Sequence, residues 1–405
     1  MALRFLTAGE SHGKALVAIV EGLPAGLPVM AEQVDQELAR RMMGYGRGAR
    51  MKIERDRIEW LSGVRAGETL GTPVAMLIHN RDWTNWEEVM AAEGTPGDVR
   101  RRRLTRPRPG HADLVGVLKY DRQDARDILE RASARETAAR VAAGALARRL
   151  LEEFGVEIGS HIVSLGGIQV PPVASLPVPL NPAADNSEIR VLDRTIEAEI
   201  IRRIDQAKKD GDTLGGEAQV VVRGLPVGLG SHVHWDRKLD GRLAGALMSI
   251  PAVKAVEIGM GFEAARRPGS EVHDPIDADA VPGTNAPDPA LRGGYRRRSN
   301  NAGGLEGGVT TGEPLVIRVG MKPISTLMSP LPTVDLTTGK AANAQSERSD
   351  VTAVPAMGVI AEGLTALVVA DAFLEKFGGD SLAEIRRNFA AYLQNLAARW
   401  GALSP

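Results

Sequence analysis

Val17-Ala-Ile-Val-Glu-Gly-Leu-Pro-Ala-Gly-Leu27 and Val220-Val-Val-Arg-Gly-Leu-Pro-Val-Gly-Leu229 share one pattern, although about two hundred residues separate them. Each is a β-branched run that ends in Gly-Leu-Pro-x-Gly-Leu, which is typical of a strand closed by a glycine and proline turn. A weaker similarity relates Thr72-Pro-Val-Ala-Met-Leu-Ile78 to Glu313-Pro-Leu-Val-Ile-Arg-Val319. We therefore expect two related βα halves packed around one core. A chance resemblance between glycine- and proline-rich turns is the alternative.

The composition indicates a soluble globular protein. The 405 residues are 43% apolar with a formal net charge of -1, so the chain can bury one large core or a few smaller ones. The absence of cysteine excludes disulfides, thiolate metal sites and cysteine nucleophiles. The first residues lack the basic and apolar regions of an export signal, so we expect a cytoplasmic protein.

Capping signals and apolar spacing predict several helices. Ser133 and Glu136 have the spacing of a capping box, and the alanine-rich run that follows ends at Gly155. Further helices are expected over 193–209, 236–250 and 355–377 and from Ser381 onward.

The apolar stretch 353–374, which includes most of the helix expected over 355–377, is interrupted by Glu362 and Asp371, which favours a buried helix over a membrane span. Two other long stretches are expected to be loops. The proline-rich stretch 171–186 is expected to be a surface excursion, and 281–301 a mobile or gating loop.

The turn Gly9-Glu-Ser-His-Gly13 presents His12 close to a group of arginines. About thirty residues later the chain contains Arg40, Arg41, Arg47, Arg50 and Arg55. Because arginine binds phosphates and carboxylates through two parallel hydrogen bonds, we expect a pocket for a multiply charged anion beside His12.

A second histidine, His111, also stands beside glycine and follows a basic run. Prolines on both sides of residue 108 fix the backbone at Arg106 and Arg108, which lowers the entropy cost of holding a guanidinium against an anion. The run 100–103 is expected to be a solvated loop. Both imidazoles can exchange protons near neutral pH. The net charge and the aromatic content of 4% argue against nucleic-acid binding.

Other chemistries find less support in the sequence. His232, His234 and Asp236 imitate a metal site, but no third histidine lies near them, so we expect a surface strand and no metal. Ser11 and His12 lack the Gly-x-Ser-x-Gly elbow of a hydrolase. The glycine-rich stretch 300–308 would let the backbone approach a flat or phosphorylated ligand, although no dinucleotide fingerprint or Walker motif is present.

Nine motifs, spread from the N-terminus to residue 350, together resemble the chorismate synthase family. They are Gly9-Glu-Ser-His-Gly13, Gly44-Tyr-Gly-Arg-Gly-Ala-Arg50, Arg108-Pro-Gly-His-Ala-Asp113, Arg131-Ala-Ser-Ala-Arg-Glu-Thr137, Asp210-Gly-Asp-Thr-Leu-Gly215, Val256-Glu-Ile-Gly259, Asn301-Ala-Gly-Gly304, Met321-Lys-Pro-Ile-Ser-Thr326 and Arg348-Ser-Asp350. The resemblance implies a single α+β domain over residues 1–405, a βα sandwich with an internal pseudo-repeat and with helices packed between antiparallel sheets. It also implies a homotetramer.

The same resemblance implies an activity and a set of contacts. Reduced FMN would support conversion of 5-enolpyruvylshikimate 3-phosphate to chorismate and phosphate. The substrate would contact Ser11, Arg41, Arg47, Arg50, Arg108 and Arg135. FMN would contact Arg131, Ala132, Ser133, Pro251, Ala252, Gly307, Lys322, Pro323, Ile324, Ser325, Thr326 and Arg348. Arg41 and Arg47 also match positions assigned to NADPH, which some members use to reduce the flavin.

The reaction that the resemblance implies is a 1,4-elimination without net redox change. By resemblance, His12 is expected at the phosphate end, His111 beside the flavin to control its charge, and Asp350 near flavin N5, where the ring proton is received. Two alternatives remain: a flavin-dependent oxidoreductase acting on a phosphorylated anion, and a phosphate-binding module without enzymatic activity.

Overall fold

Two antiparallel sheets form the framework of the computed structural model, which describes residues 3–48, 55–94, 102–278, 289–346 and 349–401. The first sheet has the order β1 (Arg4–Ala8), β2 (Ala15–Glu21), β7 (Val74–His79) and β4 (Ile58–Ser62). The second has the order β11 (Val253–Ile258), β16 (Leu315–Met321), β10 (Gly216–Arg223), β8 (Glu157–Leu165) and β9 (Ile168–Gln169).

The two sheets repeat one topology. The first pair of similar segments forms β2 and β10 with the turns that follow, and the second pair forms β7 and β16. β2 pairs with β7 as β10 pairs with β16, with Val17 opposite Leu77 and Val220 opposite Ile317. The outer neighbours also correspond, since β1 and β8 flank one side and β4 and β11 the other. The expected internal pseudo-repeat is confirmed.

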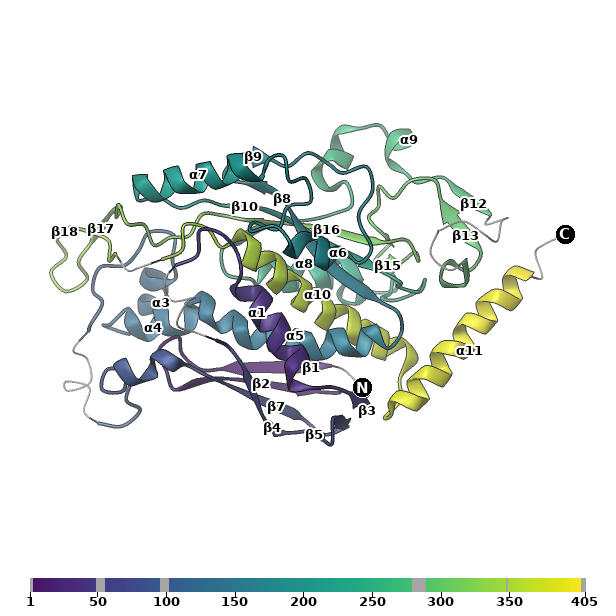
Figure 1. Ribbon diagram of the computed structural model, residues 1–405, viewed down its shortest axis with the longest axis horizontal. Helices are drawn as coiled ribbons and strands as arrows, with labels where there is room; N and C mark the ends of the chain where they lie inside the picture. Colours follow the sequence, from purple (N-terminus) through teal and green to yellow (C-terminus); the bar gives the residue numbers. More distant parts are fainter. Residues whose placement is uncertain (1–2, 49–54, 95–101, 279–288, 347–348, 402–405) are drawn as a thin grey trace.

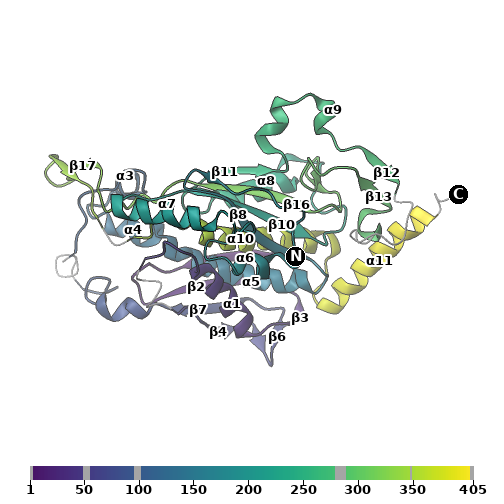
Figure 2. The same cartoon turned by 45° about the horizontal axis from the view of Figure 1, so that its top comes forward.

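Three long helices lie between the sheets (Figure 1). They are α1 (Ala31–Met42), α5 (Thr137–Glu152) and α10 (Val354–Phe377). α5 packs on β1 and β2, and α10 on β8 and β10. The turned view in Figure 2 shows the same three layers. The structure therefore has the expected α+β sandwich, with helices between antiparallel sheets.

Buried apolar side chains alternate with more exposed ones along the strands, which gives each sheet an inner apolar face. Leu16, Ala18 and Val20 of β2 are fully buried, and so are Val74 and Met76 of β7. Side chains two residues apart point to the same side of a strand, so these residues all face the helices. One cluster of buried apolar residues contains members of both sheets and of α5 and α10.

Helix α10 is the apolar stretch that the sequence predicts to be a buried helix. Its length and composition would suit a membrane span, but 89% of its most apolar window is buried inside the protein. In its middle, Glu362 is fully buried and accepts hydrogen bonds from Arg40 at 2.9 Å, Arg148 at 2.6 Å and Arg190 at 3.0 Å. Burial alone would raise the pKa of Glu362, but the three arginines outweigh it and lower that pKa.

The remaining elements surround this framework. The helices are α3 (Asp113–Lys119), α4 (Arg126–Ala132), α6 (Leu180–Asp185), α7 (Glu197–Asp210), α8 (Leu239–Met248), α9 (Gly269–Val272) and α11 (Leu382–Gly401). Short 3-10 turns are η2 (Arg81–Asn85), η3 (Ala134–Glu136), η4 (Trp235–Arg237), η5 (Gly261–Arg266) and η6 (Pro289–Arg292). The short strands are β3 (Ala25–Pro28), β5 (Val64–Arg65), β6 (Glu68–Leu70), β12 (Ile276–Ala278), β13 (Tyr295–Arg297), β14 (Leu305–Glu306), β15 (Val309–Thr310), β17 (Pro332–Val334) and β18 (Ala341–Asn343).

Two predicted helix starts have different outcomes. At α11 the capping box is present, since Ser381 N donates to Glu384 Oε2 at 3.0 Å and Glu384 N to Ser381 Oγ at 3.3 Å. At Ser133 the hydroxyl instead caps η3, a 3-10 turn that precedes α5, by accepting from Arg135 N. The Glu136 carboxylate accepts from Thr7 and Arg140. These bonds replace the predicted capping-box bond from the backbone N–H of Ser133 to Glu136.

Three loop predictions need correction. In 171–186 the part up to residue 179 is an irregular stretch that is largely exposed, as expected, but the second part forms α6, where Leu180 is buried against β8. The segment at His232 and His234 is an exposed loop before η4 and no strand. In 281–301 the part up to 288 lies outside the described residues, and the rest contains η6 and the hairpin strand β13.

Candidate active site

The turn that contains Ser11 and His12 is fixed against the end of α4. Gly9 has φ 108°, and a Cβ there would lie 2.4 Å from Ala15 O, so only glycine fits. Ser11 N donates to the carbonyl of Glu130 at 2.9 Å, and Asn80 Nδ2 donates to Gly13 O at 2.7 Å. The turn therefore holds His12 in a defined position.

The His12 ring contacts a carboxylate and an indole. Its Nδ1 lies 2.9 Å from Glu130 Oε1, and its ring stacks on Trp86 with centroids 4.0 Å apart. Glu130 is buried and also accepts from Arg126 Nη1 at 3.0 Å. Burial alone would raise the pKa of Glu130, but hydrogen bonds from His12 and Arg126 outweigh it and lower that pKa. Glu130 is therefore ionised at neutral pH.

Two predicted substrate arginines share one buried carboxylate. Arg135 Nη1 donates to Asp56 at 2.6 Å, and Arg135 Nε donates to Asn80 Oδ1 at 2.9 Å. Arg41 donates to Thr137 Oγ1, while its Nη1 lies 3.8 Å from Asp56 and has no hydrogen-bond partner among the described residues. Burial lowers the pKa of Arg41 to about 9. Positive charge is thus concentrated in a buried position.

Asp350 lies beside the same arginines. Its carboxylate is 3.3 Å from Arg47 Nε and accepts from Gly48 N at 2.5 Å. Arg47 and Asp350 also contribute to the electrostatic environment of Arg41. Three arginines face two carboxylates here, Asp56 and Asp350, which leaves an excess of positive charge suited to an anionic ligand.

His111 belongs to a second, similar arrangement. Its Nδ1 lies 2.6 Å from Asp113 Oδ1, and Arg108 Nε donates to Asp113 Oδ2 at 2.8 Å. Arg108 Nη1 also donates to Thr326 Oγ1 at 2.8 Å. Burial alone would raise the pKa of Asp113, but His111 and Arg108 outweigh it and lower that pKa. Arg108 is thereby fixed between the histidine loop and the 322–326 loop.

The 322–326 loop contacts the His111 loop through its polar side chains. Lys322 Nζ donates to Gly110 O at 2.9 Å, and Ser325 Oγ donates to the same carbonyl at 3.0 Å. Lys322 N donates to the carbonyl of Ala252, which has φ 69°. Partial burial and the charge of Lys254 lower the pKa of Lys322. Lys322 and Lys254 are therefore close enough for their charges to interact.

Backbone and side-chain bonds connect the two arrangements. Val351 N donates to Gly46 O, and Leu214 N donates to Val351 O, both at 2.8 Å. Thr213 Oγ1 donates to Ile324 O at 2.7 Å. The segment next to Asp350 is thus linked to the 322–326 loop through residues 213 and 214, which precede β10. Residues more than three hundred positions apart in sequence meet in one region.

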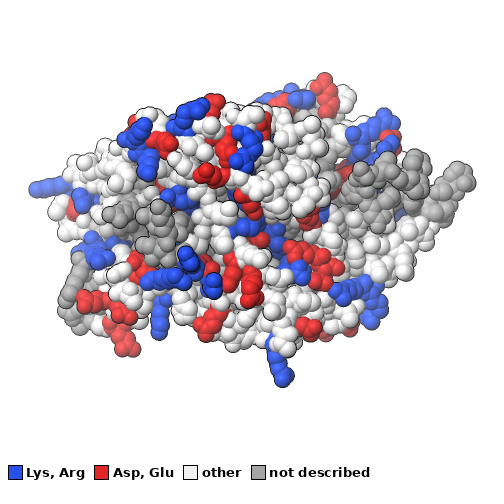
Figure 3. Space-filling view, viewed as in Figure 1, with Lys and Arg blue, Asp and Glu red and all other residues white. Residues whose placement is uncertain are grey.

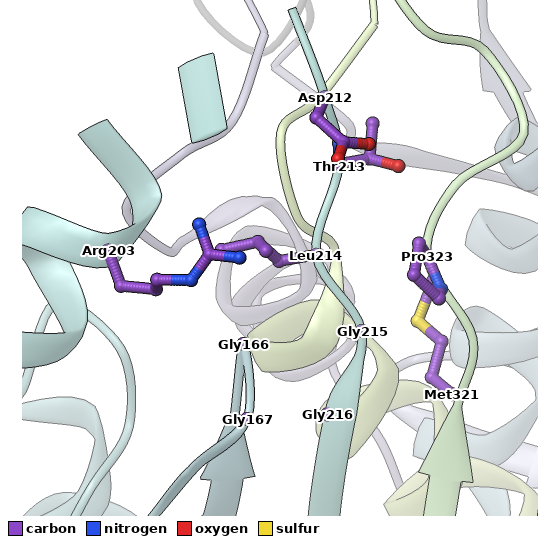
Figure 4. A pocket seen from close by; sticks show the side chains of 10 residues that line it. All are labelled: Gly166, Gly167, Arg203, Asp212, Thr213, Leu214, Gly215, Gly216, Met321 and Pro323. Carbon is purple, nitrogen blue, oxygen red and sulfur yellow. The ribbon is translucent and has the colours of Figure 1, made fainter. Parts of the chain in front are cut away.

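A hollow of about 370 Å³ lies behind this link (Figure 4). Figure 4 shows Arg203 of α7 pointing toward Leu214, with Met321 and Pro323 on the other side. Its lining consists of Gly166, Gly167, Arg203, Asp212, Thr213, Leu214, Gly215, Gly216, Met321 and Pro323. The hollow borders the 322–326 loop, so it belongs to the same region.

Most predicted flavin contacts lie near these groups, and one does not. Ser133 Oγ is 3.1 Å from Ser11 Oγ, and Arg131 Nη2 donates to Thr7 O at 2.8 Å, which places the end of α4 beside the His12 turn. Gly307 lies at the N-terminal end of α8, whereas Ala252 follows its C-terminal end. Ten helical residues span about 15 Å. Gly307 is therefore separated from Ala252 by about the length of α8 within one chain.

The other predicted site residues are placed as follows. Arg50 and Arg348 lie outside the described residues. Arg106 is exposed near Gln345, so only Arg108 of this pair is held rigidly. His234 is exposed and bonded to Asp236 at 2.7 Å. Within the described ranges no three acidic or histidine side chains form a possible metal site.

Sequence reasoning missed the buried carboxylates that orient the functional groups. Asp56 follows Arg55 in a basic stretch and gave no signal of its own. Glu130 directly precedes the Arg131 motif, and Asp113 lies two residues after His111. A histidine or arginine that must be held rigidly in a buried site needs such a partner, and that requirement was the available signal.

Comparisons with known proteins show the family to which this chain belongs. Residues 3–374 match the family model described as chorismate synthase. The chain belongs to the chorismate synthase family. It is therefore an enzyme of the carbon–oxygen lyase class, and its family works in the shikimate pathway on a phosphorylated small molecule, generally with reduced flavin.

Individual relatives agree with the family over the whole chain. The chorismate synthase of Streptomyces coelicolor is 57% identical over 98% of this chain and 99% of its own length. That of Symbiobacterium thermophilum is 56% identical over 98% of this chain and all of its own. A crystal structure of chorismate synthase, 42% identical, gives a TM-score of 0.77 and covers 98% of this chain and 99% of that chain.

Proposed function

We propose that this chain eliminates phosphate from 5-enolpyruvylshikimate 3-phosphate to give chorismate, with reduced FMN bound beside the substrate. In this 1,4-elimination the C–O bond to phosphate breaks, a ring proton leaves and a new C=C bond forms, so no net oxidation occurs. The observation that carries the proposal is the group of Arg41, Arg47 and Arg135, which Asn80 links to the turn that contains His12. The substrate is a phosphate with two carboxylates, and these arginines offset and orient its negative charge.

The residues at the 322–326 loop fit an anionic flavin. Lys322 and Lys254 place two cations there, and Ser325 and Thr326 add hydroxyls. Ser133 at the end of α4 adds a further hydroxyl. When bound, reduced FMN would supply electron density that assists cleavage of the C–O bond. Lys322, Ser325 and Ser133 would hold it and exclude water from the reacting carbon.

Three side chains of this chain carry the proton transfers in the proposal. His12, beside the buried arginines, protonates the departing phosphate. His111, bonded to Asp113 and next to the 322–326 loop, sets the charge of the bound cofactor. Asp350, 3.3 Å from Arg47, receives the ring proton. Hydrogen bonds connect the segments that carry Asp350 and the 322–326 loop, and the proposal places one bound substrate among the three side chains.

The oligomeric state, location and partners are also proposals. The outer face of the first sheet carries an apolar pair, Leu6 67% and Ile19 37% exposed and directly opposite each other, with the exposed ion pair of Arg4 and Glu21 beside it. The corresponding face of the second sheet carries Gln219 and Arg318 instead. An apolar outer face on only one of two related sheets supports a homotetramer that buries it.

The protein is proposed to be cytoplasmic and to act on a small molecule, without nucleic acid or membrane. In the face shown in Figure 3, side chains of both charges are interspersed and no large basic patch is seen. NADPH is a further proposed ligand of Arg41 and Arg47, as the reductant of FMN. Flavin reduction by NADPH with the purified protein, compared with Arg47→Ala, tests this activity.

One experiment tests the main proposal. The protein is incubated without oxygen with photoreduced FMN and 5-enolpyruvylshikimate 3-phosphate, and chorismate absorbance and free phosphate are followed. We expect both to form in equal amounts with FMN far below the substrate concentration, because the elimination leaves the cofactor unchanged. Equal rates with oxidised FMN would contradict the cofactor assignment. Oxidation of FMN in proportion to product would instead indicate an oxidoreductase.

A further inference from the structure

The two histidines are held by the same arrangement of side chains. In each case an imidazole Nδ1 faces a buried carboxylate that is itself paired with an arginine. One set is Arg126, Glu130 and His12. The other is Arg108, Asp113 and His111. Glu130 belongs to α4 and Asp113 begins α3, so the two sets occupy different parts of the fold, and the shared geometry calls for a shared physical reason.

The carboxylates determine which ring nitrogen carries the proton. An ionised carboxylate only accepts hydrogen bonds, so a nitrogen 2.9 Å from Glu130 Oε1 must donate. The lowered pKa of Glu130 and of Asp113 keeps both carboxylates ionised. Arg108 Nη2 also lies 3.1 Å from His111 Nδ1, but the 2.6 Å contact with Asp113 is shorter and involves the anion. His111 Nδ1 therefore also donates.

We propose that Glu130 and Asp113 are positioning residues that fix His12 and His111 as Nδ1–H tautomers, leaving Nε2 of each ring as the nitrogen that exchanges protons in the reaction. This inference rests on the proposed roles of the two histidines. A neutral Nδ1–H ring has its lone pair on Nε2, on the opposite side from the carboxylate. To protonate the departing phosphate, His12 must first bind a second proton at Nε2; it gives that proton to the phosphate and returns to the Nδ1–H tautomer. The tautomer and the ring direction are thus set by the same bond.

Neighbouring groups reinforce the position of His12. Glu130 Oε2 accepts the backbone N–H of His12 at 2.8 Å, so one carboxylate holds both the ring and its main chain. The stack on Trp86 fixes the plane of the ring. Arg102 and Arg126 lie 4.5 and 4.8 Å from the centroid of that indole and hold it in turn. His12 therefore has little freedom to turn Nδ1 toward a ligand.

Glu130→Gln is the informative substitution, because it keeps the shape and removes the charge. The amide nitrogen must then face Arg126 or the backbone N–H of His12, both of which are donors. The single amide oxygen can accept from only some of the donors that Glu130 accepts from, namely Arg126, the backbone N–H of His12 and His12 Nδ1. Either tautomer of His12 therefore becomes possible. Glu197→Gln is the matched control: Glu197 is also buried and accepts from Ser187 Oγ and Glu188 N, away from both histidines.

Two measurements on the whole protein test the inference. Protein labelled with 15N only at histidine Nδ1 is studied by solid-state NMR, and the His12 and His111 signals are identified by their loss in His12→Asn and His111→Asn. We expect both Nδ1 atoms to be protonated in the unsubstituted protein at neutral pH. An unprotonated Nδ1 at either ring would overturn the inference for that ring, whatever the activity. This measurement needs no folded carboxylate variant.

Kinetics provide the second measurement. We expect Glu130→Gln to lower kcat by about 10²-fold or more, the usual scale of acid–base assistance, with KM changed much less. Glu197→Gln should leave kcat unchanged even if it lowers the melting temperature. Normal turnover by Glu130→Gln together with an inactive His12→Asn would overturn the positioning role alone. Normal turnover by His12→Asn would instead overturn the proposed role of His12, and with it the catalytic part of this inference.

Discussion

Gly144 of α5 and Gly363 of α10 face each other where the two central helices cross. A Cβ built on Gly144 would lie 2.5 Å from Gly363 Cα, whereas a Cβ on Gly363 would meet nothing closer than 3.7 Å. The two helices belong to opposite halves of the pseudo-repeat, so this contact sets the separation of the two sheets. Only one of the two glycines is sterically required.

We therefore expect opposite results from two similar substitutions. Gly144→Ala forces the backbones apart and should destabilise the protein by about 1–3 kcal/mol or more. Gly363→Ala has room for its methyl group and should be neutral or stabilising by up to about 1 kcal/mol, the difference in helix propensity. Urea unfolding of both variants gives the two free energies. Equal losses would show that the helices do not cross at this point.

Glu362→Gln should cost about 3–5 kcal/mol of unfolding free energy at pH 7, because it removes the fully buried anion that Arg40, Arg148 and Arg190 share. Glu37 and Asp185, which also pair with these arginines, are less buried and compensate only part of the positive charge. Glu375→Gln, which breaks exposed ion pairs with Arg237 and Arg242, is the control and should cost at most about 1 kcal/mol.

The cost of Glu362→Gln should also depend on pH. The pKa of Glu362 is lowered on folding, so its stabilisation is fully present above the ordinary value of 4.5 and is lost as pH falls through the lower folded pKa. Unfolding curves between pH 7 and pH 3 should show the difference between the two proteins shrinking. A difference that grows on acidification would contradict the assignment of charge.

Removing Arg135 should weaken substrate binding by about 2–5 kcal/mol, because Arg135→Ala takes away the closer cation of the buried Asp56 and leaves that negative charge opposed by Arg41 at 3.8 Å. Arg50→Ala is expected to act in the same way, although its position lies outside the described residues. Arg103→Ala should have little effect, since Arg103 is exposed and, within the described residues, donates to the backbone carbonyl of Gln123. Calorimetric titration at fixed salt compares the substrate affinities of the three variants. Similar losses of affinity in all three would show that the substrate does not bind at the proposed pocket.

Asp350→Asn keeps the side-chain shape and removes the proposed base. Turnover should fall by about 10²-fold or more, while substrate and FMN affinities change much less. The structure suggests a specific alternative, because Asp350 is 3.3 Å from Arg47 and accepts from Gly48 N. If it only fixes Arg47, binding should weaken and preformed ternary complexes should turn over normally. Single-turnover rates on those complexes decide between the two roles.

Light scattering should give the mass of a tetramer, and Leu6→Asp should break the assembly by placing a charge on the apolar outer face of the first sheet. Leu118→Asp is the control, because Leu118 is 73% exposed on α3, outside that sheet. A monomer at micromolar concentration, or a tetramer unaffected by Leu6→Asp, would contradict the proposed interface.

Much of the fold follows from local patterns in the sequence. The paired Gly-Leu-Pro-x-Gly-Leu segments predicted two related halves, and β2 and β10 occupy equivalent places. Strand alternation and turn residues act over a few neighbours, so they can be read without the fold. The apolar stretch around Glu362 was correctly predicted as buried because the acid interrupts it. The motifs of His12 and His111 likewise pointed to one site.

The partners of those residues were decided by tertiary structure. Glu130 lies 118 positions from His12, and Asp56 lies 79 positions from Arg135, so no local spacing relates them. The capping carboxylate expected at Glu136 is taken by Thr7 and Arg140, because a buried acid bonds to the strongest donors that packing brings near. Local physics selects the elements of this protein. Only tertiary packing determines which charges meet, since burial requires each of them to find a partner that is distant in sequence.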